Sequence, residues 1–106
     1  MRITIRRGSE MVIITFHTRG NFESDYERNK FFRGLYGWKQ IVPKNDKRYL
    51  YHRAGLLDEI EHEKIADSVL LVAVKDMHRI IRYFQQWDDK VECKAMEVVV
   101  RKRRLL

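Results

Sequence analysis

A run of seven residues without a charged side chain, Ser68–Val74 (SVLLVAV), constrains the fold more than any other segment. Its apolar side chains fall on both faces of an extended chain, which is typical of a central strand that is covered on one side and paired on both edges. A chain of 106 residues, 44% of them hydrophobic and 35% charged, suits one domain with one core. We therefore predict a single domain over residues 1–106 with this strand near its centre.

The composition excludes several classes of protein. One cysteine, Cys93, cannot form a disulfide framework or a cysteine-rich zinc site. No apolar run approaches the roughly 18 to 20 residues that span a bilayer. The first ten residues (MRITIRRGSE) also lack the apolar stretch of a signal peptide. We therefore expect a cytoplasmic protein that does not contact membranes and needs no cofactor.

Two segments have the pattern of amphipathic helices. In the first, Ser24 and Glu27 form a capping box, and apolar residues recur at helical spacing as far as Tyr36. Gly37 follows at a position where glycine commonly ends a helix. The second helix is expected after Asp76, which can cap it. Its apolar stripe consists of Met77, Ile80, Ile81, Phe84 and Trp87.

Residues typical of strands lie between and around these helices. β-branched and aromatic side chains predict strands over 12–18 and 91–100. Two shorter segments, 38–42 and 48–53, are joined by the turn-rich residues 43–47 and predict a hairpin. The acidic stretch Leu56–Lys64 is expected to form either one or two helical turns or an irregular excursion of the chain outside the regular elements.

The order of these elements predicts an α+β fold, a ferredoxin-like βαββαβ sandwich with an elaborated middle hairpin. Two helices can cover only one face of the sheet, so we expect a homodimer to cover the other. Residues 1–10 either add an edge strand or form an N-terminal arm, and translation starts at Met1 or at Met11. Whether the hairpin is inserted in the sheet or projects from it is left open.

The positive charge is concentrated in two places. Residues 28–53 hold eight basic side chains against Asp46 alone, and the tail 101–106 contains Arg101-Lys102-Arg103-Arg104. Such patches attract phosphates. We therefore predict a non-catalytic protein that binds nucleic acid, either RNA or DNA, through this region and the tail. The candidate binding residues are Arg28, Arg33, Lys44, Lys47, Arg48, Tyr49, Tyr51 and Arg53.

Tyr49 and Tyr51 are two residues apart, so on a strand they project to one face together with Arg53. There they could stack on unpaired bases. Alternatively, both rings pack within the sheet or a dimer seam, and the basic residues form an ordinary solvated surface.

Two other functions remain open. His17, Glu23 and Asp25 could serve a small metal-dependent nuclease or phosphotransfer enzyme. The chain could also be a protein-interaction module that docks a partner on its sheet face and its acidic segment 56–67. No motif identifies a catalytic residue or a metal ligand, so none is assigned and we favour a protein without chemistry of its own.

Overall fold

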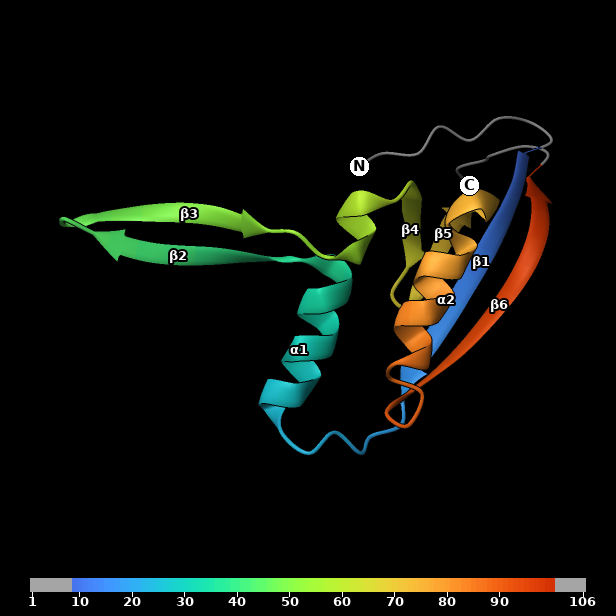
Figure 1. The fold of residues 1–106 in the computed structure, drawn as a ribbon, viewed down its shortest axis with the longest axis horizontal. Helices are drawn as coiled ribbons and strands as arrows, with labels where there is room; N and C mark the ends of the chain where they lie inside the picture. Colours follow the sequence, from blue (N-terminus) through green and yellow to red (C-terminus); the bar gives the residue numbers. More distant parts are fainter. Residues whose placement is uncertain (1–8, 101–106) are drawn as a thin grey trace.

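The computed structural model describes residues 9–100 as a four-stranded antiparallel sheet, two helices and a separate two-stranded sheet (Figure 1). The elements in chain order are β1 (Ser9–Thr18), α1 (Asp25–Tyr36), β2 (Trp38–Lys44), β3 (Lys47–Arg53), the 3₁₀ turn η1 (Leu56–Glu59), β4 (His62–Ala66), β5 (Val69–Ala73), the 3₁₀ turn η2 (Val74–Asp76), α2 (Met77–Gln85) and β6 (Val91–Val100). The basic tail 101–106 and most of the predicted N-terminal strand or arm lie outside the described residues.

The larger sheet has the strand order β4-β5-β1-β6, and every pair of neighbours is antiparallel. β1 runs along β6 over its whole length, from the pair Ser9↔Val100 to the pair Thr18↔Val91. β5 lies between β4 and β1, which confirms the prediction that the apolar run is paired on both edges.

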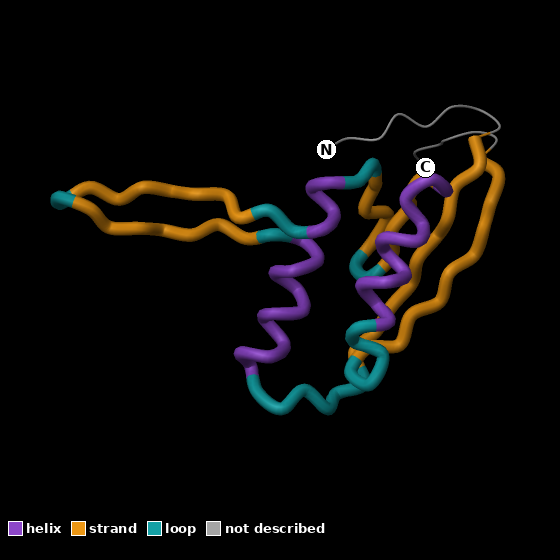
Figure 2. Tube along the Cα trace, in the orientation of Figure 1, coloured by secondary structure: helices purple, strands orange, loops and turns teal. Residues whose placement is uncertain are grey.

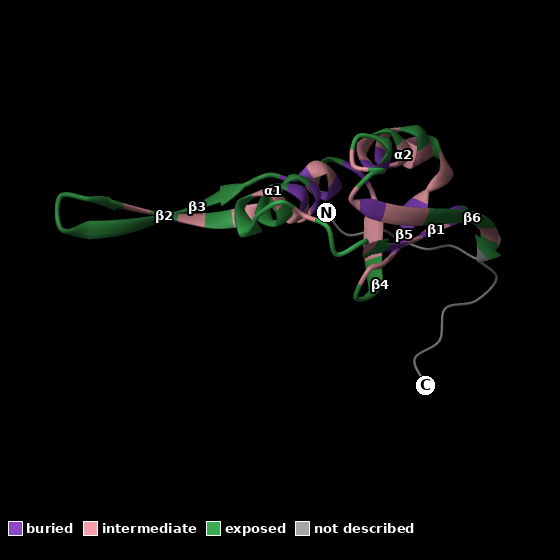
Figure 3. Ribbon diagram, turned by 90° about the horizontal axis from the view of Figure 1, so that it is seen from below, coloured by how far each residue is buried: buried purple, intermediate pink, exposed green. Residues whose placement is uncertain are grey.

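One face of this sheet carries the main core. Val12, Ile14 and Phe16 of β1 point into it beside Leu70 and Val72 of β5. Both helices contribute to the same cluster, α1 through Phe31 and Leu35 and α2 through Ile80 and Phe84. Figure 3 shows these buried segments where α2 lies over the sheet. The opposite face holds a smaller cluster of Met11 and Leu71 with Ile13 and Val98 against it.

Phe31 is the centre of the helix packing. Its fully buried ring makes edge or tilted contacts with the rings of Phe16, Phe84 and Trp87, with centroid distances of 6.1, 6.0 and 5.4 Å. The Tyr83 hydroxyl donates a hydrogen bond to the Phe31 carbonyl at 2.6 Å, which ties α2 to α1. Burial raises the pKa of Tyr83 to about 12, so this donor keeps its proton at neutral pH.

The boundaries of α1 follow the predicted signals, whereas α2 ends at Gln85, before Trp87, the last residue of its predicted apolar stripe. Ser24 Oγ accepts from the Glu27 amide at 3.1 Å, while the Glu27 carboxylate accepts from the Glu23 amide. α1 ends at Gly37, as predicted. Asp76 precedes α2, but its side chain makes no capping hydrogen bond.

The segment Leu56–Lys64 is only partly as predicted. Leu56–Glu59 forms one 3₁₀ turn, but His62–Ala66 is a strand, β4, which pairs with β5 at the edge of the sheet. Its residues HEKIA are mostly polar, and charged side chains are common on edge strands because they discourage pairing with other chains. Because β4 is mostly polar, its sequence did not predict a strand.

The predicted hairpin forms, but its strands do not join the larger sheet. Among the described residues β2 and β3 pair only with each other, and they project from the end of α1 (Figures 1 and 2). Their turn consists of Asn45 and Asp46, both with positive φ, as the tight hairpin turns of type I′ require. The radius of gyration is 16.1 Å, whereas a compact chain of this length has about 13 Å.

Two glycines hold the base of the hairpin. The chain leaves α1 at Gly37 and returns at Gly55, where the backbones touch: a Cβ added to Gly37 would lie 2.9 Å from the Gly55 nitrogen and 2.6 Å from the Arg53 carbonyl oxygen. Gly37 also has φ 79° and ψ −179°, a combination that is almost restricted to glycine. Position 37 therefore requires glycine for two reasons: its backbone conformation is unfavourable for other residues, and a side chain there would overlap the returning chain.

We predict that Gly37→Ala lowers the free energy of unfolding by about 3 kcal/mol or more, since it combines backbone strain with overlap. Gly20→Ala is the matched control, because Gly20 also has positive φ but a Cβ there meets nothing within 4 Å. We expect Gly20→Ala to lower the free energy of unfolding by roughly 1–2 kcal/mol. Chemical denaturation of both variants measures the two free energies of unfolding. Equal decreases in the two variants would contradict a close contact between the backbones at Gly37 and Gly55.

Candidate nucleic-acid interface

The projecting hairpin has two faces of different composition. In an antiparallel pair, cross-strand partners share a face and successive residues alternate between faces. The register Trp38↔Arg53 to Lys44↔Lys47 therefore defines both sets. The aromatic face consists of Trp38, Gln40, Val42, Lys44, Lys47, Tyr49, Tyr51 and Arg53. The aliphatic face consists of Lys39, Ile41, Pro43, Arg48, Leu50 and His52.

Cations lie beside the rings of the aromatic face. The Arg33 guanidinium of α1 lies over the Trp38 ring at 4.3 Å from its centroid, and that of Arg53 lies 5.4 Å from the Tyr51 centroid. Arg53 Nε also donates to Gln40 Oε1 at 2.7 Å across the strands. These contacts hold two guanidinium groups at the base of the hairpin.

A hollow of about 360 Å³ adjoins the aromatic face where α1 meets the hairpin. Tyr26, Lys30 and Arg33 are spaced at about one helical turn, so one side of α1 presents all three to it. The complete lining is Tyr26, Asn29, Lys30, Arg33, Gly34, Trp38 and Ala54. The lining contains two cations and no carboxylate, a composition that suits a phosphate group.

Most of the predicted binding residues fall on this surface. Lys44, Lys47, Tyr49, Tyr51 and Arg53 belong to the aromatic face. The tyrosine rings do not pack in the core of the described chain, since Tyr49 is 42% and Tyr51 45% exposed.

Two predicted residues lie elsewhere. Arg48 belongs to the aliphatic face. Arg28 lies over the Phe32 ring at 4.7 Å and lines a different hollow with Asp25. Lys30 and Arg33 were expected from the sequence to share a basic surface with the hairpin, and both line this hollow. Trp38, which lines it with them, was not among the predicted residues.

The Asp58 carboxylate contacts two groups at the base of the hairpin. Asp58 Oδ2 accepts a hydrogen bond from the Gly55 amide at 2.7 Å and lies 3.1 Å from His52 Nε2. The Gly55 amide, and to a lesser degree His52, holds the pKa of Asp58 below its ordinary value of 3.8. The charged carboxylate therefore ties β3 to η1.

A lowered pKa makes this contribution to stability depend on pH. It is fully present above pH 3.8, the ordinary value for aspartate, and is lost as the pH falls through the lowered pKa of the folded state. We predict that Asp58→Asn, which removes only the charge, lowers the melting temperature at pH 7. The difference from the wild type should shrink below pH 4. Thermal melts across this range test it, and a difference that grew in acid would contradict the assignment.

The residues considered for metal chemistry do not converge. His17 Nε2 lies 2.9 Å from Glu92 Oε2 of the neighbouring strand. Asp25 begins α1, and the Glu23 amide, just before the N-cap Ser24, donates a hydrogen bond to the Glu27 carboxylate. Within residues 9–100 no three side chains of histidine, cysteine, aspartate or glutamate are grouped as metal ligands.

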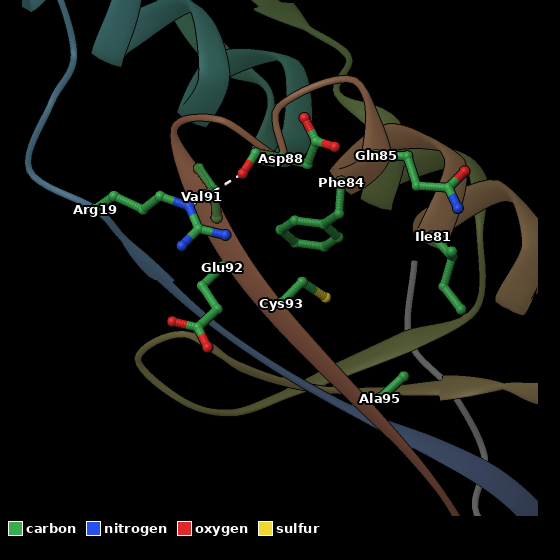
Figure 4. A pocket seen from close by; sticks show the side chains of 9 residues that line it. All are labelled: Arg19, Ile81, Phe84, Gln85, Asp88, Val91, Glu92, Cys93 and Ala95. Atoms are coloured by element: carbon green, nitrogen blue, oxygen red, sulfur yellow. Dashed lines mark hydrogen bonds between the residues drawn. The ribbon is translucent and has the colours of Figure 1, made fainter.

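A second hollow, of about 250 Å³, lies between α2 and β6 (Figure 4). Ile81, Phe84 and Cys93 line it, and Arg19 Nε donates to the Asp88 carbonyl at its rim. Burial raises the pKa of Cys93 to about 11, so its thiol is protonated at neutral pH. A protonated thiol in an apolar wall is a packing residue and not a nucleophile.

No protein-family model, no curated protein and no solved structure matches the chain. Among residues 9–100, no helix is long and apolar enough to cross a membrane.

Proposed function

We propose that this protein binds nucleic acid through the projecting hairpin and the adjoining side of α1, by contacts to phosphates. The observation that carries the proposal is the hairpin itself. Residues 38–53 contain five basic side chains and one acidic side chain, and within residues 9–100 the hairpin strands pair only with each other.

A two-stranded hairpin alone is marginally stable in water, and a partner that covers this one would stabilise it. Both faces of this one expose large apolar groups. On the aliphatic face Ile41 is 61% and Leu50 62% exposed, although the two side chains are cross-strand neighbours. The basic charge favours a polyanion as the partner, since phosphate contacts supply most of the affinity in nucleic-acid binding.

We also propose a ferredoxin-like architecture for the remainder of the chain. Numbered in chain order, the four strands of the larger sheet lie 2-3-1-4, with α1 after the first and α2 after the third. This order, with both helices in the core on one face, supports the assignment.

A homodimer through the opposite face of that sheet is part of the proposal. Ile13 and Met96 are cross-strand neighbours there, next to the Met11↔Val98 pair. Met96 is 66% exposed, and apolar sheet faces of this kind are commonly covered by a second copy.

The test is fluorescence anisotropy with labelled single- and double-stranded DNA and RNA at two salt concentrations. We expect Lys44→Glu combined with Lys47→Glu to weaken binding about tenfold or more, because two phosphate contacts on the aromatic face are replaced by repulsion. The slope of log K against log salt should also fall by about 1.4 to 1.8, since each contact contributes roughly 0.7 to 0.9.

Lys75→Glu combined with Arg82→Glu is the matched control. It changes the net charge equally at exposed positions of η2 and α2, outside the hairpin and outside the proposed dimer face. We expect it to bind almost as the wild type does. Equal losses in both variants would mean that net charge alone drives binding. No binding by the wild type at low salt would overturn the proposal in favour of a protein partner.

A further inference from the structure

The two faces of the hairpin differ in what they offer to a nucleic acid. The aromatic face presents three rings, those of Trp38, Tyr51 and Tyr49, in succession from base to tip. The aliphatic face has Ile41, Pro43 and Leu50 at its centre, which provide no aromatic ring. The one ring on the aliphatic face is the imidazole of His52 at the base of the hairpin, where it contacts Asp58. The rings that could stack on bases along the length of the hairpin therefore lie on the aromatic face.

The groups on the aromatic face suit unpaired bases better than a duplex. A base in a duplex exposes only its edges, which are recognised by Arg or Lys at guanine and by Asn or Gln at adenine. On this face Arg53 and Gln40, its one amide, are hydrogen-bonded to each other. An unpaired base exposes the flat face of its ring, which stacks on tyrosine or tryptophan whatever the sequence.

Cations accompany the rings along the whole length of this face. Arg33 and Arg53 lie beside Trp38 and Tyr51, while Lys44 and Lys47 are cross-strand neighbours near the tip. Neither the aromatic face nor the hollow beside α1 contains a carboxylate. A strand of seven residues spans about 24 Å, which is long enough for several nucleotides.

We infer that the ligand is single-stranded nucleic acid, with its bases stacked on Tyr49, Tyr51 and Trp38 and its phosphates held by the neighbouring cations. The hollow with Lys30 and Arg33 receives a phosphate at the base of the hairpin. The inference rests on the proposed nucleic-acid binding and adds the strand type and the face that carries it.

The first arm of the test compares a labelled oligothymidylate with a duplex of the same length. Tyr49→Leu and Tyr51→Leu retain apolar bulk and remove the ring. We expect each to weaken binding of the oligothymidylate about 5-fold to 150-fold, the range for one stacked base. Tyr51→Phe retains the ring and should bind within about twofold of the wild type, because stacking does not need the hydroxyl.

Leu50→Ala is the matched control, since Leu50 lies between the two tyrosines and on the opposite face. It should leave the affinity for the oligothymidylate unchanged, and a loss equal to that of the tyrosine variants would overturn the assignment to the aromatic face.

The second arm measures stacking directly through Trp38. The chain has two tryptophans, and Trp87→Phe leaves Trp38 as the only one. We expect oligothymidylate to quench the fluorescence of this variant, whereas the duplex binds at least about tenfold more weakly and quenches less. Circular dichroism of each variant confirms that it is folded.

The failures of the two proposals can be told apart. Duplex binding as tight as single-strand binding would overturn the inference alone. The inference alone would also fail if the tyrosine variants bound normally while Lys44→Glu with Lys47→Glu lost affinity. No binding of either probe by the wild type at low salt would overturn the proposed function as well.

Discussion

The close approach of the Gly37 and Gly55 backbones allows the hairpin and the larger sheet to form in one chain. It closes the hairpin at its base, so the chain that leaves α1 returns to almost the same place before it enters η1 and β4. The larger sheet can therefore form as though the hairpin were absent. The hairpin in turn is held by backbone contacts and by Asp58, and its strands need no place in the core.

The core supports this arrangement by fixing the direction of α1. Phe31 is enclosed by rings from β1 and α2, and the Tyr83 hydroxyl binds its carbonyl. Gly34 allows this approach, because a Cβ there would lie 2.5 Å from the Tyr83 hydroxyl. α1 therefore turns one side to the core, while Lys30 and Arg33 on another side meet the base of the hairpin. α1 therefore contributes to the core through one side and to the proposed binding surface through another.

Local signals predicted much of the fold. The capping box of α1, the apolar stripe of α2 and the turn of the hairpin each depend on residues close together in the sequence. β4 was missed because its pairing with β5 outweighs its weak strand propensity, and a pairing energy is not visible in the segment itself. The placement of both tyrosines with Arg53 on one face was predicted, since alternation along a strand is also local.

Composition and short-range periodicity were enough to locate the basic region, the two tyrosines on one strand and the hairpin. Three features could be known only from the folded chain: the hairpin projects, Arg33 lies over Trp38, and Arg48 faces away from the tyrosines. Strand pairing, register and helix packing depend on contacts between residues that are distant in the sequence. The location of a charged side chain relative to a ring is fixed only when those contacts form.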